Sequence, residues 1–144
     1  MELNFVHVKN FSNGSGYLLP PGEYWVGDPC HIVDVRMWRM LLTMNFDSHE
    51  EMFCGKYDDH YIAALSTAYG DGLFLDNRFK QFSVDSGTIG IVDTFFLKKE
   101  MKETGLENIH RFTEPIQFYK NNDDTIFIND EWFIITNQEL AIKA

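Results

Sequence analysis

The sequence has few basic residues and no long apolar run. Its 12 lysines and arginines stand against 22 aspartates and glutamates, which gives a formal net charge of −10. A surface with this charge repels phosphate backbones and argues against nucleic-acid binding. No apolar run approaches the roughly 20 residues that a membrane-spanning helix needs. These two shortages exclude nucleic acid and membrane as partners and leave a protein or a small-molecule ligand.

Cysteine is also scarce, with one thiol at Cys30 and one at Cys54. Two cysteines do not make the disulfide framework of a small secreted protein. The first four residues lack the basic start and apolar stretch of a secretory signal. We therefore expect a cytoplasmic protein in which both thiols are free.

Metal and nucleophile motifs are missing as well. The histidines and cysteines show none of the HxxxH, CxxC or HxH spacings that are typical of zinc sites, so the sequence predicts no metal ligands. Cys30 and His31 are adjacent, and neighbours in a strand point to opposite sides. We therefore do not expect them to act as a nucleophile and its base.

What the chain does contain is a large apolar and aromatic fraction. Hydrophobic residues make up 44% of its 144 residues and aromatic residues 15%, including 13 phenylalanines. A chain of this size and composition buries a core without disulfides. It predicts one globular domain over residues 1–144.

The central stretch, residues 68–93, contains three turn signals. They lie at residues 70–72, 76–77 and 85–87 and are rich in glycine and aspartate. Such residues tolerate the positive φ angles of tight turns, and the runs between them are rich in Phe, Leu, Ile and Val. The pattern predicts a β-meander of adjacent antiparallel hairpins.

Apolar runs separated by turn residues also define the predicted elements in the rest of the chain. Strands are predicted at residues 3–8, 23–26, 53–55, 61–69, 109–112, 116–119, 125–128 and 131–136, with a glycine-rich loop at 10–16 and a strand-end corner at 27–30. Helices are predicted at 34–44, where Trp38, Leu41 and Leu42 share an apolar stripe, and at 94–104. The fold class is α+β, mainly antiparallel β with two short helices, and a sandwich and an open barrel fit equally.

Five aspartates lie at predicted turns or strand ends: Asp28, Asp71, Asp76, Asp85 and Asp93. Loop carboxylates are ligands that Mg²⁺ and Ca²⁺ prefer. The simpler interpretation is that each aspartate binds the backbone of its own turn. Because turns at one end of a sheet lie side by side, we expect Asp28 to approach Asp71 or Asp85. Without a cation or a hydrogen-bond donor between them, one carboxylate would then have a pKa above its usual value.

Three motifs carry a resemblance: Gly27 to Cys30 (GDPC), Tyr69 to Gly72 (YGDG) and Val84 to Gly90 (VDSGTIG). Together they resemble motifs of small uncharacterised bacterial and phage proteins. The resemblance covers roughly residues 20–93. It implies a bacterial or phage protein and no particular activity.

Two functions follow from these observations. The first is a non-catalytic binding or interaction protein, with Asp28, Asp71, Asp85 and His60 as ligand-binding residues. The alternative is a small metal-dependent hydrolase or phosphoesterase that uses the turn carboxylates, with His60 as its acid–base group. We expect no cofactor for the first function and Mg²⁺ or Ca²⁺ for the second.

Overall fold

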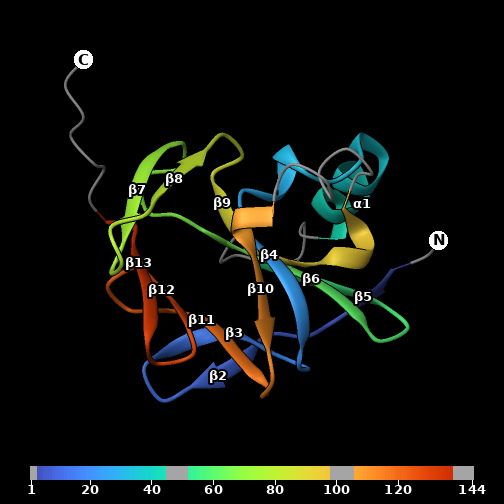
Figure 1. Ribbon diagram of the computed structural model, residues 1–144, viewed down its shortest axis with the longest axis horizontal. Coiled ribbons are helices and arrows are strands. Elements are labelled where there is room, and N and C mark those ends of the chain that lie inside the picture. The colour runs from blue at the N-terminus through green and yellow to red at the C-terminus, as the bar shows by residue number, and fades with distance from the viewer. Residues whose placement is uncertain (1–2, 45–51, 98–105, 138–144) are drawn as a thin grey trace.

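The computed structural model describes residues 3–44, 52–97 and 106–137, which form two antiparallel sheets (Figure 1). The first sheet runs in the order β1 (Asn4–Phe5), β5 (Met52–Tyr57), β6 (His60–Ser66), β9 (Thr88–Asp93), β4 (Gly22–Gly27) and β10 (Ile109–Phe112). The second runs β2 (Lys9–Phe11), β3 (Gly14–Leu19), β11 (Ile116–Asn121), β12 (Thr125–Ile128), β13 (Trp132–Ile135), β7 (Gly72–Asp76) and β8 (Gln81–Val84). The predicted α+β class, dominated by antiparallel strands, is confirmed.

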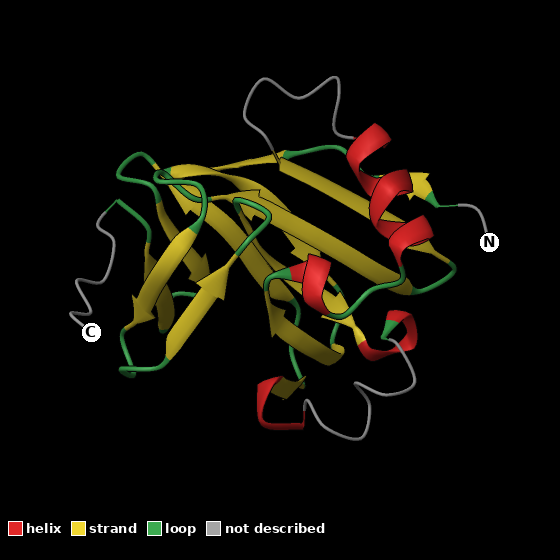
Figure 2. Ribbon diagram, turned by 90° about the horizontal axis from the view of Figure 1, so that it is seen from above, coloured by secondary structure: helices red, strands yellow, loops and turns green. Residues whose placement is uncertain are grey.

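Two apolar clusters hold the sheets. One cluster draws buried side chains from both sheets, among them Val26 and Ile91 from the first and Tyr17 and Phe118 from the second. The other lies on the opposite face of the first sheet, where α1 (Val35–Met44) packs against it (Figure 2). Because successive side chains of a strand alternate sides, central strands of the first sheet contribute to both clusters.

The helix begins as predicted. The Asp34 carboxylate accepts hydrogen bonds from the backbone N–H groups of Arg36 at 2.6 Å and Met37 at 3.4 Å. Leu41 is fully buried and Trp38 is half-buried with its ring against Phe53. The helix turns its Trp38 and Leu41 side toward the sheet.

The expectation that Leu42 is buried is wrong, since 48% of it is exposed. Each helical residue is rotated by about 100° from the one before it. Leu42 therefore lies at the margin of the packed face that Leu41 occupies.

The predicted loop at residues 10–16 is also wrong, because β2 and β3 form a hairpin there. A Cβ added to Gly14 would lie 2.1 Å from the carbonyl oxygen of Lys120, and one added to Gly16 would lie 2.1 Å from that of Phe118. These glycines allow β11 to approach closely, so they belong to a strand rather than to a flexible loop.

The central stretch forms strands as predicted, but not one meander. Strands β7 and β8 form a hairpin in the second sheet, whereas β9 pairs with β4 and β6 in the first. The turn at residues 85–87 therefore carries the chain from one sheet to the other. The burial pattern supplies the reason: β8 alternates between exposed and buried residues, whereas β9 is buried on both faces from Thr88 to Val92.

Short 3₁₀ turns complete the fold: η1 (Pro29–His31), η3 (Thr94–Phe96) and η4 (Leu106–Asn108). Of the second predicted helix, residues 94–96 form η3, and residues 98–105 lie outside the described residues. In the described part of the chain, no helix is long and apolar enough to cross a membrane.

Distant parts of the chain pair in both sheets. In the second sheet β3 pairs with β11, with Leu19 opposite Ile116. In the first sheet β4 pairs with β10, with Trp25 opposite Ile109. The predicted strands at 109–112, 116–119, 125–128 and 131–136 are confirmed within one or two residues at their ends.

Candidate functional site

Asp28 follows the last residue of β4 and caps the turn η1. Its extended backbone, with φ −78° and ψ 114°, is the conformation that a residue before proline prefers. Its carboxylate oxygen Oδ1 accepts a hydrogen bond from the N–H of Cys30 at 3.0 Å. The predicted corner is therefore present. A 3₁₀ turn also starts there, which the prediction of a strand-end corner did not include, because Pro29 suits the first position of such a turn.

The same carboxylate binds a turn that is distant in sequence. Asp28 Oδ2 accepts from the backbone N–H of Asp85 at 2.6 Å and of Ser86 at 2.9 Å, and Oδ1 accepts from the Ser86 hydroxyl at 2.6 Å. With the Cys30 N–H, four donors surround a side chain that is only 2% exposed. We call this arrangement the Asp28 clamp; it joins the end of β4 to the β8–β9 turn.

The hydrogen bonds of the clamp favour the ionised form of the Asp28 carboxylate. Burial favours a raised pKa, but the hydrogen bonds from Ser86, Asp85 and Cys30 outweigh burial and lower the pKa of Asp28 below its ordinary value of 3.8. The raised pKa expected for carboxylates without a donor therefore does not arise at Asp28, which has four donors. The reason is that Asp28 meets the backbone of Asp85 rather than the Asp85 carboxylate alone.

His31 lies over the clamp and faces solvent. Its Nε2 lies 2.5 Å from Asp85 Oδ2 and 4.0 Å from Asp28 Oδ2. The side chains of His31 and Asp85 are 37% and 69% exposed, so water screens their attraction. The prediction that Asp28 approaches Asp85 is confirmed, with His31 as their shared neighbour.

Both cysteines are free, as predicted. Burial, followed by the hydrogen bond and the charge of Asp28, raises the pKa of the Cys30 thiol to about 12. Burial also raises the pKa of Cys54. A thiol with such a pKa is protonated at neutral pH and is a weak nucleophile. The structure therefore offers no activated thiolate at either position.

Asp71 and His60, the other two predicted site residues, make no hydrogen bond to Asp28 among the described contacts. Asp71 is exposed, and its Oδ1 lies 3.9 Å from the position that a Cβ on Gly87 would occupy. It is therefore beside the same turn. His60 begins β6, whereas Ser66, the last residue of β6, pairs with Thr88 near the clamp. Six residues of strand span roughly 20 Å, so His60 does not join this site.

His60 has a structural environment of its own. Its Nδ1 lies 2.9 Å from Asp93 Oδ2, and its ring stacks on Phe95 with centroids 4.1 Å apart. Asp76 and Asp93 bind the backbone of their own turns, at Arg78 and Phe95 respectively. For these two aspartates the simpler interpretation made from the sequence is confirmed.

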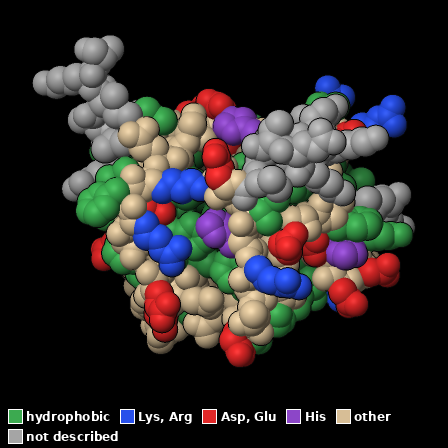
Figure 3. Space-filling view, in the orientation of Figure 1, with side chains coloured by type: hydrophobic (Ala, Val, Ile, Leu, Met, Phe, Trp, Pro, Cys, Tyr) green, Lys and Arg blue, Asp and Glu red, His purple; other side chains and the backbone are tan. Residues whose placement is uncertain are grey.

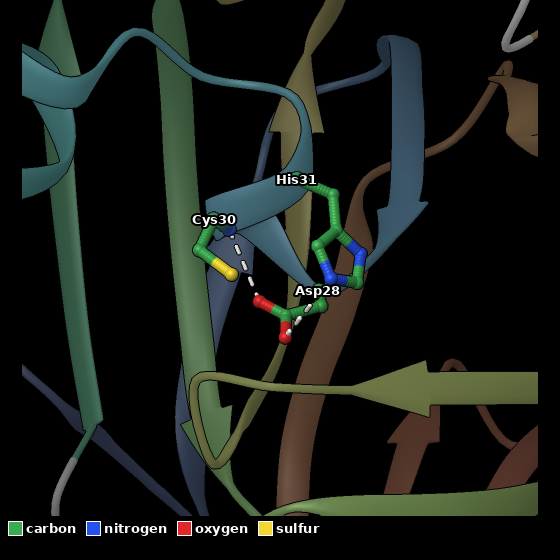
Figure 4. A group of neighbouring side chains, drawn as sticks. All are labelled: Asp28, Cys30 and His31. Carbon is green, nitrogen blue, oxygen red and sulfur yellow. Dashed lines mark hydrogen bonds and ion pairs between the residues drawn. The ribbon is translucent and has the colours of Figure 1, made fainter.

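Asp28, Cys30 and His31 form a mixed group of metal-ligating side chains. One ligand atom from each lies within 4.8 Å of the other two (Figure 4). Neighbouring side chains point to opposite sides in a strand, but Cys30 and His31 lie in a 3₁₀ turn. Such a turn has three residues per turn, which places Asp28 and His31 on the same side. A capping Asp directly before Pro was the sequence signal that could have revealed this geometry.

A pocket also lies at the β8–β9 turn. This turn pocket has a volume of about 470 Å³ and is lined by residues 66–70, residues 86–88, Leu42 of α1 and Phe53 of β5. The N–H of Thr67 donates to the carbonyl of Gly87 at 3.0 Å and joins the two turns. Sequence reasoning placed glycines and aspartates here but missed the hydroxyl residues.

Basic side chains gather elsewhere, between β10 and the β7–β8 hairpin (Figure 3). Arg78 lies 4.9 Å from the ring centroid of Trp132, and the ammonium group of Lys80 donates to Asn108 Oδ1. Burial, helped by Lys80 and Arg78, lowers the pKa of His110. Packing within the chain accounts for these cations.

Comparison of the chain with protein-family models, curated proteins and solved structures finds no match. The resemblance to small bacterial and phage proteins stays a prediction. The clamp and the turn pocket are therefore the features of the molecule that bear on its function.

Proposed function

We propose that the protein is a non-catalytic binding protein whose turn pocket takes a small, uncharged molecule that carries hydroxyl or amide groups. The observation that carries the proposal is the lining itself. None of the described residues that line the pocket is charged, although the chain has a net charge of −10. A volume of about 470 Å³ lies within the usual range for small-molecule sites.

The lining matches such a ligand in chemistry. Ser66, Thr67, Ser86 and Thr88 supply hydroxyl oxygens. Those of Thr67 and Ser86 donate their protons within the chain, to the Gly70 carbonyl and to Asp28, and can still accept a hydrogen bond from a ligand. Leu42 supplies apolar surface, and this role accounts for its exposure. A sugar or a nucleoside has the corresponding mixture of polar edges and an apolar or ring face.

Tyr69 gives the pocket an exposed aromatic ring. It lines the pocket and is 59% exposed. An exposed tyrosine offers a large contact area at a low cost in conformational entropy. We infer that its ring covers the apolar or ring face of the bound molecule.

The walls are held in place before any ligand binds. Thr67 Oγ1 donates to the carbonyl of Gly70 at 2.5 Å. The Asp28 carboxylate holds Ser86 by accepting from its backbone N–H and its hydroxyl. A site that is ordered in advance loses less entropy on binding. The clamp therefore serves the pocket as a structural support.

The architecture fits this assignment. Two sheets around one shared cluster support a sandwich rather than an open barrel. In a sandwich the turns gather at the ends of the sheets, where binding sites commonly form.

The alternative, a metal-dependent hydrolase that uses turn carboxylates, has less support. All four acceptor positions of Asp28 are used within the clamp, and His60 is at the far end of β6. A hydrolase of this kind would need carboxylate oxygens that are open to a hydrated cation.

The proposal is tested with matched pairs of ligands. Neutral monosaccharides and nucleosides are compared with their phosphorylated forms by ligand-observed NMR and by thermal unfolding. We expect one neutral member to bind and raise the melting temperature, and its phosphorylated form to bind at least about tenfold more weakly.

Two variants locate the binding. Tyr69→Ala removes the aromatic ring and is expected to weaken binding by about tenfold. Phe79→Ala is the matched control, because Phe79 is an exposed aromatic residue outside the pocket. Equal effects of the two variants, or binding of the phosphorylated forms alone, would contradict the proposal.

A further inference from the structure

The turn η1 places a thiol, an imidazole and a carboxylate around one point. Figure 4 shows the sulfur of Cys30 and the ring of His31 on either side of the Asp28 carboxylate. The ligand atoms lie within 4.8 Å of one another, and Asp85 Oδ2 lies 2.5 Å from His31 Nε2. We propose that Asp28, Cys30 and His31, with Asp85 as the fourth ligand, bind a divalent transition-metal ion of the zinc class. This proposal does not require a ligand in the turn pocket, although Ser86 of the clamp also lines that pocket.

The spacing suits a four-coordinate ion after small movements. Ligand atoms around a tetrahedral zinc ion lie roughly 3.5 Å apart, as follows from metal–ligand distances of about 2.0–2.3 Å. The ligand atoms of Asp28, Cys30 and His31 lie within 4.8 Å of one another, so shifts of roughly 1 Å bring them to that spacing. His31 and Asp85 are exposed, so their side chains have room to rotate and part around an ion.

The donor set selects the kind of ion. Sulfur and imidazole nitrogen are ligands of zinc and its neighbours in the transition series, whereas Mg²⁺ and Ca²⁺ require six or more oxygens. A thiol and an imidazole from one short turn, with carboxylates beside them, therefore favour Zn²⁺ or Co²⁺. This choice differs from the Mg²⁺ or Ca²⁺ that the carboxylates alone suggested.

The charge balance points the same way. Among the described residues, no lysine or arginine forms a salt bridge with the buried Asp28; the side chain paired with it, at 4.0 Å, is the imidazole of His31. On metal binding the thiol proton leaves to solvent, and the thiolate and the Asp28 carboxylate together neutralise a divalent cation. Asp85 then adds one further negative charge at the solvent-exposed side.

One acceptor position of the Asp28 carboxylate can become free for the metal ion. Ser86 Oγ lies 2.8 Å from Thr88 Oγ1 as well as 2.6 Å from Asp28 Oδ1. If the serine hydroxyl donates to Thr88 instead, one acceptor position of Oδ1 becomes open to the ion. The backbone N–H groups of Cys30, Asp85 and Ser86 continue to orient the carboxylate, as outer hydrogen bonds do in metal sites.

The experiment uses Co²⁺ as the probe, titrated into the full chain after treatment with a chelator. We expect one Co²⁺ per chain, with visible d–d bands of a four-coordinate ion and a near-ultraviolet charge-transfer band from a thiolate. Added Zn²⁺ should remove both signals by displacement. A chain that binds no Co²⁺, or binds it without the charge-transfer band, would overturn the proposal.

Three variants assign the ligands. Cys30→Ser should abolish the charge-transfer band, whereas Cys54→Ala, the matched control at the other thiol, should keep it. His31→Gln should weaken Co²⁺ binding by at least about tenfold; its exposed side chain makes misfolding no concern. Retention of the band in Cys30→Ser, or unchanged affinity in His31→Gln, would overturn the proposed ligand set.

Discussion

Asp28 and Asp93 cap 3₁₀ turns at opposite ends of the paired strands β4 and β9, and each has a histidine beside it. The first binds Cys30 N–H in its own turn and the second binds Phe95 N–H in its own turn. The difference is what the second carboxylate oxygen does. In Asp28 it accepts from a turn that is distant in sequence, and in Asp93 it meets His60.

This difference changes what surrounds each histidine. His60 is held by Asp93 on one side and by the ring of Phe95 on the other. His31 contacts the exposed Asp85, and no ring contact holds it among the residues that the structure describes. A capping aspartate therefore belongs to a packed corner at one end of the strand pair. At the other end it lies beside the solvent-exposed side chains of His31 and Asp85.

The largest expected difference is in the effect of removing each carboxylate. Asp28→Ala leaves buried N–H donors of two segments without a partner and should lower the free energy of unfolding by about 3–5 kcal/mol. Asp93→Ala removes an ordinary cap and should cost about 1–2 kcal/mol. Urea unfolding measures both, and equal losses would contradict the comparison.

Acid unfolding gives a second difference. Because the pKa of Asp28 is lower in the folded state than in the unfolded state, the unfolded chain binds more protons between the two values. The stabilisation from Asp28 is complete above the unfolded value near 4 and is lost as the pH falls through the folded value.

The measurement is the slope of unfolding free energy against pH below pH 4. We expect Asp28→Asn to flatten this slope, whatever its effect on stability at neutral pH. The variant Asp93→Asn is the control. An unchanged slope in Asp28→Asn would mean that the carboxylate is not held ionised by the clamp.

The smallest expected difference concerns the two histidines. His60→Ala removes a stacked ring and a hydrogen bond and should cost about 1 kcal/mol. His31→Ala removes an exposed contact and should change stability by less than about 0.5 kcal/mol. Thermal or urea unfolding of the two variants distinguishes them, and a larger loss for His31 would reverse the comparison.

Much of the local structure was predictable from the sequence. The strands after residue 108 are separated by clear turn residues, and α1 has a capping Asp34 and an apolar stripe. The hairpin of β2 and β3 was missed because Gly14 and Gly16 resemble loop residues until β11 is placed beside them. Close approach of another strand is a tertiary fact that no local pattern encodes.

The candidate site was predictable only in part, because some of its residues meet through tertiary contacts. Turn aspartates at one end of a sheet were expected to meet, and Asp28 does meet the turn of Asp85. The ligand set with Cys30 and His31 was missed because the 3₁₀ turn replaced the alternation of a strand. The pocket was missed because its hydroxyl residues come from two turns whose neighbourhood depends on the chain crossing between sheets.

The pairing of β3 with β11 and of β4 with β10 has a consequence for how the chain folds. The second sheet joins β3 to β7 only through β11, β12 and β13, so it cannot form as one sheet before these late strands are available, and until then the first sheet lacks its edge strand β10. Such non-local pairing carries a large loop-closure cost, and domains of this kind fold in milliseconds to seconds rather than microseconds. During that interval the unpaired edges of β3 and β4 are open to other chains, which makes the nascent protein most vulnerable to aggregation before its final strands appear.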